Sequence, residues 1–206
     1  MQSRIRAVIF DLGNVLVDFD HMIAARRICA FTEKTPAEMY GLFFDSELTG
    51  LFEEGKISPQ GFFAQVKKLL GLNLSFDEFL PIWNEIFFLS EKNRSVYDIA
   101  KKLKANYKVA LLSNVNILHF DYLKKEFPVF DAFHQIFTSY EAGLRKPHPV
   151  IYQNALSALG EEPPFVFYTD DRQDLINEAA RLGIRAFQFT TIEKLKEDLN
   201  SVGARF

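Results

Sequence analysis

Polar groups suited to acid–base and metal chemistry follow four short apolar runs of the chain. An apolar run of four to eight residues closed by a polar or turn residue is typical of a buried strand. If such strands were parallel, their polar ends would meet at one edge of the sheet, where open α/β folds bind ligands. The residues that follow these runs are Asp11, Ser113, Asn114, Lys146, Asp170 and Asp171.

Together, these residue types indicate phosphoryl transfer. The three carboxylates are hard oxygen ligands of the kind that Mg²⁺ prefers, and their mutual repulsion favours a bound cation. Lys146 supplies a compact positive charge for phosphate oxygens, while Ser113 and the backbone at Asn114 can form an anion cradle. A carboxylate nucleophile, Mg²⁺, a lysine and a hydroxyl predict a reaction through an aspartyl-phosphate.

Each candidate also has an ordinary structural interpretation. Asp11 and Ser113 could cap helices, and Lys146 could be an exposed surface lysine. Because all four strand ends are expected at one edge of the sheet, the functional interpretation is favoured for these three residues and for Asp170. For Asp171 the two interpretations remain balanced, because one acid of a pair often only anchors a loop.

Strands and helices alternate after Ser90, which predicts βαβ units and a doubly wound parallel sheet. A first strand precedes Asp11. The other strands are expected at 107–112, 135–138, 165–168 and 184–189, with helices at 92–105, 116–126, 147–159, 173–182 and 191–199.

The chain between Asp20 and Phe88 has helical patterns and no predicted strand. Start signals such as Ser75 with Glu78, and stops such as Gly71, delimit helices near 20–32, 36–45, 46–54, 58–70 and 75–87. We therefore predict an α/β fold with an inserted all-α cap. The predicted domains are a catalytic core at 1–17 and 90–206 and a helical cap at 18–89.

Composition narrows the class of protein. The 206 residues are 48% hydrophobic, enough for a substantial core, and the net charge of −3 argues against nucleic-acid binding. A single cysteine, Cys29, cannot form an internal disulfide and is expected to be a buried structural thiol. No apolar run is long enough for a membrane span, and the N-terminus does not resemble a signal peptide. We expect a soluble cytoplasmic protein, monomeric or homodimeric, with no membrane or nucleic-acid partner.

The four segments resemble the motifs of the haloacid dehalogenase-like (HAD) hydrolase superfamily. They read FDLGNVL at 10–16, LSN at 112–114, GLRKP at 143–147 and YTDD at 168–171. The resemblance implies a Rossmann-like core with a helical cap, with Asp11 as nucleophile and Mg²⁺ bound by Asp11 and Asp170. It also implies that Ser113 and Lys146 hold the phosphoryl group and that Asp171 is an indirect or water-mediated metal ligand.

The chain departs from this family pattern at Gly13. Phosphatases of the family usually carry there an Asp that protonates the leaving group and then activates water, whereas Gly13 offers only its backbone carbonyl to the metal. The segment is similar to that of bacterial sugar-1-phosphate (glucose-1-phosphate) phosphatases, whose leaving group needs less protonation. Asp18, Asp20 or His21 could substitute for the missing acid, and Gly13→Asp is expected to raise activity on alkyl monoesters.

Two functions follow as hypotheses. The first is a Mg²⁺-dependent phosphatase for a small phosphorylated metabolite, with a sugar 1-phosphate as a candidate substrate. The second is a binding or regulatory protein of this fold with little catalytic activity, because Gly13 removes the acid/base. The cap segment 53–56 could reach the site and select the substrate, or it could be a solvated turn. His119, His134 and His148 lack metal-ligand spacing and are expected to be structural.

Overall fold

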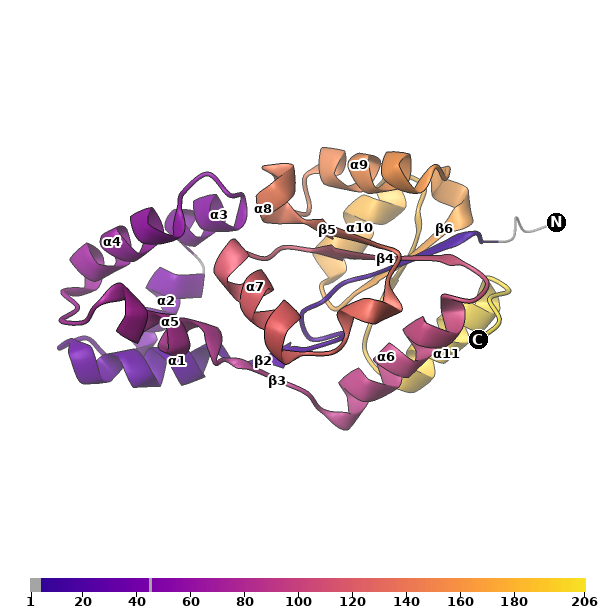
Figure 1. Ribbon diagram of the computed structural model, residues 1–206. Helices are drawn as coiled ribbons and strands as arrows, with labels where there is room; N and C mark the ends of the chain where they lie inside the picture. Colours follow the sequence, from indigo (N-terminus) through magenta and orange to yellow (C-terminus); the bar gives the residue numbers. More distant parts are fainter. Residues whose placement is uncertain (1–4, 45) are drawn as a thin grey trace.

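Five parallel strands form the central sheet, in the order β5-β4-β1-β6-β7 (Figure 1). The computed structural model describes residues 5–44 and 46–206. Each strand of this sheet overlaps a predicted one, so the predicted doubly wound α/β fold is confirmed. The strands are β1 (Ala7–Phe10), β4 (Lys108–Ser113), β5 (Gln135–Thr138), β6 (Val166–Asp170) and β7 (Arg185–Gln188).

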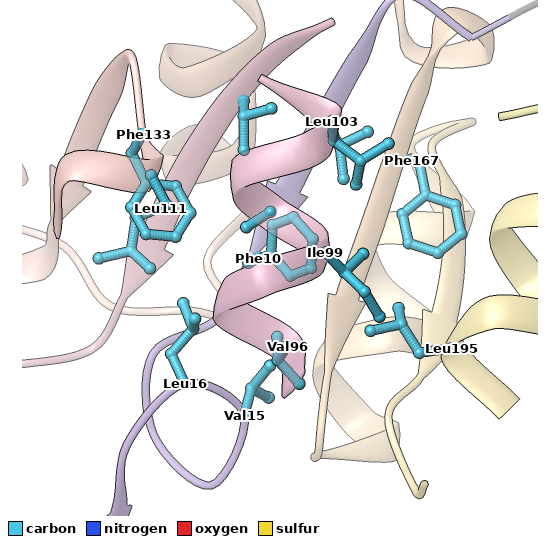
Figure 2. Close-up of a cluster of buried hydrophobic side chains, with 14 of the residues drawn as sticks. Phe10, Val15, Leu16, Val96, Ile99, Leu103, Leu111, Phe133, Phe167 and Leu195 are labelled. Carbon is cyan, nitrogen blue, oxygen red and sulfur yellow. The ribbon is translucent and has the colours of Figure 1, made fainter. Parts of the chain in front are cut away.

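Helices cover both faces of the sheet, which explains why β1 is apolar throughout. Successive side chains of a strand point to opposite faces, so Val8 and Phe10 pack in one core cluster while Ala7 and Ile9 pack in another. Helices α6 (Glu91–Leu103) and α11 (Ile192–Ser201) cover the first cluster, shown in Figure 2, and α9 (Pro149–Leu159) and α10 (Gln173–Arg181) cover the second. The remaining helical elements of the core are α7 (Ile117–Glu126), α8 (Ser139–Ala142), η2 (Phe130–Ala132) and η3 (Pro163–Phe165).

The cap helices gather beside the core (Figure 1). They pack around a cluster rich in aromatic side chains. Phe62 lies at its centre, stacked on Phe52 with ring centroids 4.3 Å apart and packed against Phe79 and Trp83. Such contacts let short helices bury enough apolar surface to form a core of their own. The cap elements are α1 (His21–Ile28), η1 (Cys29–Phe31), α2 (Pro36–Phe44), α3 (Glu47–Glu53), α4 (Pro59–Leu70) and α5 (Phe76–Asn84).

Capping residues mark the ends of two cap helices, as the sequence predicted. Ser75 and Glu78 form the expected capping box at the start of α5, and Gly71 ends α4 in the left-handed conformation with a φ of 62°. Cys29 differs from its prediction, because it is half-buried in η1 and its thiol donates to the carbonyl of Ala25 at 3.2 Å.

A two-stranded antiparallel ribbon joins cap and core. The sequence predicted no strand here, and it predicted that the last cap helix would continue to residue 87. Strand β2 (Asp18–Phe19) pairs with β3 (Phe87–Phe88), and α5 ends at Asn84 rather than near residue 87. Two-residue strands carry no periodicity, so only the pairing of distant segments reveals them. Helix α9 begins at Pro149 rather than Pro147, and the short α8 was not predicted. No helix in the described part of the chain is long and apolar enough to cross a membrane.

Candidate active site

The carboxyl ends of the central strands place the predicted site residues around one cavity of about 400 Å³. Asp11 directly follows β1, and its backbone N–H donates to the carbonyl of Thr169 at 2.9 Å, which continues the pairing of β1 with β6. Ser113 and Asp170 are the last residues of β4 and β6. The cavity is lined by all seven residues predicted from the sequence: Asp11, Gly13, Ser113, Asn114, Lys146, Asp170 and Asp171.

Lys146 lies between two of the carboxylates and is 3% exposed. Its ammonium group donates to Asp11 Oδ1 and to Asp170 Oδ2, each at 2.7 Å. It also donates to the Leu112 carbonyl at 2.9 Å and to the Tyr168 hydroxyl at 3.2 Å. Burial opposes the charge, but the two carboxylates keep the pKa of Lys146 above its usual value.

The acidic cluster carries more negative charge than Lys146 neutralises. The pKa of Asp11 is raised to about 7, chiefly by burial; Lys146 opposes this rise, and Asp170 and Asp171 contribute to it. Asp170 behaves differently: burial opposes its charge, but Lys146, the Tyr168 hydroxyl and the backbone N–H of Arg172 lower its pKa. Each of the three aspartates offers an oxygen within 4.8 Å of the others. Three oxygen donors with uncompensated charge fit a hard divalent cation such as Mg²⁺.

Asp171 is held by the loop that follows β1. Asn14 adopts the left-handed conformation, with a φ of 55°, and its side-chain amide donates to Asp171 Oδ2 at 3.0 Å. Burial raises the pKa of Asp171. Asp171 therefore makes a loop contact and contributes to the acidic cluster at the same time.

Asn114 positions Lys146 through its side chain. Its amide nitrogen donates to the Lys146 carbonyl at 2.9 Å, and its amide oxygen accepts the Lys146 backbone N–H at 2.8 Å. These two bonds fix the backbone on which the buried ammonium depends. Ser113 is 3% exposed and lines the main cavity as well as a smaller adjoining cavity of about 80 Å³.

Of the three residues suggested as substitutes for the missing acid, only His21 lines the cavity. Asp18 accepts hydrogen bonds from Lys92 at 2.6 Å, from Ser90 at 2.8 Å and from Asn93 at 3.1 Å. Burial opposes its ionisation, but these bonds hold the pKa of Asp18 below its usual value. Asp20 caps α1 by accepting the backbone N–H of Met22 at 2.8 Å. Both aspartates therefore serve the junction between cap and core.

Some cavity residues were left open by the sequence and others were missed. Glu53, in the segment 53–56 for which a role at the site was one interpretation, reaches the cavity from the end of α3, and Arg145 Nη1 donates to its Oε2 at 3.0 Å. Phe19 fills the space beside Gly13, since a Cβ on residue 13 would lie 2.8 Å from the Phe19 ring. Arg145 and Tyr168 lie inside recognised motifs, which is the one signal that could have drawn attention to them. Glu53 and Phe19 depend on how the cap docks.

A comparison with models of known protein families identifies the family of this chain. The family model for haloacid dehalogenase-like hydrolases matches residues 5–183. The chain belongs to this family. The resemblance that the four motifs carried is therefore confirmed, and the chain is a hydrolase.

Relatives agree with this assignment. The chain is 30% identical over 193 residues to a D-ribitol-5-phosphate phosphatase of Bacteroides thetaiotaomicron, covering 89% of this chain and 91% of the relative. It is 26% identical to a HAD family enzyme of the same organism, solved in complex with magnesium and inorganic phosphate. That superposition has a TM-score of 0.80 and covers 91% of this chain and 95% of the other. A predicted HAD-like hydrolase from Porphyromonas gingivalis shares the fold, with a TM-score of 0.82 at 22% identity, over 99% of this chain and 100% of the other.

Proposed function

We propose that this HAD-like hydrolase is a Mg²⁺-dependent phosphatase that releases inorganic phosphate from a small phosphorylated metabolite through an aspartyl-phosphate. The observation that carries the proposal is the position of Asp11, beside Lys146 and Ser113 in one cavity and within the acidic cluster. The phosphatase named above and the relative solved with magnesium and phosphate support it.

Each side chain has a definite part in this reaction. The Asp11 carboxylate attacks phosphorus, and the Lys146 ammonium neutralises charge on the nucleophile and on the transferring oxygens. The Ser113 hydroxyl and the Asn114 backbone N–H orient the phosphoryl group. Asp11, Asp170 and the Gly13 carbonyl would hold Mg²⁺, with Asp171 acting indirectly or through a water, and the metal would supply further charge neutralisation.

The cavity favours a small polar leaving group. Besides the acidic cluster, its wall carries Glu53, Arg145 and His21, and the adjoining cavity of about 80 Å³ extends it only slightly. Hydroxyl groups would find hydrogen-bond partners on this wall, which suits a sugar or polyol phosphate. A sugar 1-phosphate and D-ribitol 5-phosphate, the substrate in the relative's name, are the two substrates to compare first.

Phosphate release with Mg²⁺ and with excess chelator tests the proposal, using wild type and Asp11→Asn. We expect release from at least one substrate of a sugar and polyol phosphate panel, and none with chelator or in the variant. A matched control is Asp174→Asn, because Asp174 pairs with Arg172 at the surface. Full activity of Asp11→Asn would refute the role of Asp11 as the nucleophile. No turnover by the wild type on any phosphate would favour a binding or regulatory protein.

A further inference from the structure

Glu53 lines both cavities of the site, as does Gly13, which stands where phosphatases of the family usually carry the acid/base aspartate. Glu53 ends α3 in the cap, and it lines the main cavity together with Asp11 and Gly13. It also lines the smaller cavity with Gly13 and His21. A substrate whose phosphorus is held at Asp11 would therefore occupy the same cavity as Glu53.

Contacts with the core hold Glu53 in this place. Its backbone carbonyl accepts the Ser139 hydroxyl at 2.6 Å, and its side chain accepts the Arg145 guanidinium at 3.0 Å. Gly50 leaves room for that guanidinium, because a Cβ on residue 50 would lie 2.7 Å from Arg145 NH2. A cap residue anchored to the core on both its backbone and its side chain is fixed relative to the nucleophile, as acid–base catalysis requires.

The protonation of the cavity's titratable groups distinguishes Glu53 from His21. Burial lowers the pKa of His21 to about 4, so its imidazole is neutral near neutral pH and has no proton of suitable acidity to give. Burial raises the pKa of Glu53; Arg145 and Arg172 oppose this rise, and Glu54 adds to it. A carboxyl group with a raised pKa holds its proton closer to neutral pH and can return it during the reaction.

We propose that Glu53 protonates the leaving-group oxygen and then activates water, in place of the aspartate that position 13 lacks. The inference rests on the proposed phosphatase function. As Asp11 forms its bond to phosphorus, the bond to the leaving oxygen breaks and that oxygen takes the Glu53 proton. The Glu53 carboxylate then accepts a proton from the water that attacks the aspartyl-phosphate. Inorganic phosphate leaves, and the Asp11 carboxylate and the protonated Glu53 are restored.

The leaving group provides the test, because a good leaving group needs no proton. We would measure the first turnover of the Mg²⁺-loaded protein with p-nitrophenyl phosphate and with an alkyl phosphate that the wild type hydrolyses. In Glu53→Gln, release of the alcohol should fall by ~10²–10⁴-fold, while the first release of nitrophenol should stay within ~10-fold of wild type. Steady-state turnover of both substrates should fall, because the water step also loses its base.

Two further variants separate catalysis from cap placement. Glu47→Gln is the matched control, since Glu47 is the exposed acid at the start of α3 and lines neither cavity, and it should keep both activities. Glu53→Asp retains an acid on a shorter side chain and should recover part of the alcohol release. Equal loss of both first-turnover rates in Glu53→Gln, or the same selective loss in Glu47→Gln, would overturn the role of Glu53. A wild type that releases nothing from either substrate would instead overturn the proposed phosphatase function, and the role of Glu53 with it.

Discussion

The Phe19 ring occupies the space that a side chain at position 13 would need. A Cβ on residue 13 would lie 2.8 Å from Cε1 of Phe19, closer than a side chain tolerates. The Phe19 ring is itself confined by His21, with centroids 4.7 Å apart, and by Phe87, at 6.1 Å. The acid missing from position 13 is therefore not a single-residue difference, because the cap junction has filled its place.

This packing changes what Gly13→Asp should do. From the sequence alone, that variant was expected to gain activity on alkyl monoesters. With Phe19 in place, we expect Gly13→Asp to lower both the Tm and the phosphatase activity, since overpacking a filled site typically costs ~1–3 kcal/mol. Combining it with Phe19→Ala should recover stability relative to Gly13→Asp and raise turnover of alkyl phosphates above that of Phe19→Ala alone. A gain in activity from Gly13→Asp by itself would show that the ring moves aside freely.

Lys146 neutralises charge on the carboxylates on either side of it. Removing Lys146 should therefore lower the stability of the protein most when no metal is bound. Lys146→Met leaves Asp11 and Asp170 buried side by side, and breaking a buried ion pair costs ~3–5 kcal/mol. Saturating Mg²⁺ should offset part of this loss, so it should raise the Tm more in the variant than in wild type. Thermal unfolding with and without Mg²⁺ measures the difference. Lys101→Met, which removes an exposed pair with Asp131, should leave the metal effect unchanged.

Strand-end residues were predictable because a turn or polar residue after an apolar run is a local signal. All seven predicted residues line the cavity for that reason. Phe19 was not predicted as a site residue, and for Glu53 the sequence left a role at the site and a solvated turn both open. Both residues reach the cavity through contacts between segments far apart in the sequence, which residue type and spacing do not determine.

At the scale of elements, the end of α3 is docked on α8 through a glycine. Gly55 has a φ of 65°, and a Cβ there would lie 2.3 Å from the carbonyl oxygen of Tyr140. Gly55 therefore permits a backbone approach that no other residue allows. The segment 53–56, for which a solvated turn was one interpretation, is in contact with the core at this point.

Gly55→Ala should separate this turn from α8 and displace the adjacent Glu53. We expect a lower kcat on alkyl phosphates, with Mg²⁺ affinity close to that of wild type because the aspartates lie on other elements. Gly71→Ala is a matched control: Gly71 has a similar φ of 62°, but nothing lies within 4 Å of its Cβ position. Both variants carry a strain of ~1 kcal/mol from the left-handed backbone, and only Gly55→Ala should lose activity beyond that. Equal activity in the two variants would argue against the docking role.

Helices whose capping residues lie close together in the sequence were predicted, whereas the short strands β2 and β3, each of which pairs with a distant segment, were missed. Ser75 with Glu78 marked the start of α5, and the structure places the helix there. The ribbon of β2 and β3 has two residues on each side, and the Asp18 side chain in it is bound by residues of α6 and its N-cap. No periodicity within either segment could have indicated that pairing.

At the scale of the molecule, cap and core share one buried interface through α7. Ile117 and Leu118 of this core helix pack against the aromatic cluster of the cap, and His119 stacks on Trp83 with centroids 4.8 Å apart. Nε2 of His119 donates to the Trp83 carbonyl at 3.0 Å, so Nδ1 accepts the amide of Asn116 at 3.1 Å. Both ring nitrogens are used by the neutral imidazole, in keeping with the structural role predicted for His119.

This arrangement makes the stability of the whole chain depend on pH. Burial lowers the pKa of His119 from 6.5 to about 3, and His21 adds to this effect while the bond to Trp83 opposes it. Below pH 6.5, His119 is therefore protonated in the unfolded chain but stays neutral in the folded chain. The contribution of His119 to the free energy of unfolding is complete above that pH and declines as the pH falls. Between about pH 7.5 and about pH 5 the loss from His119 should be about 2 kcal/mol. Urea unfolding of wild type and His119→Gln at both pH values measures it: the variant should lose less stability than wild type by that amount. Equal losses in the two proteins would mean that the ring accepts a proton in the folded state.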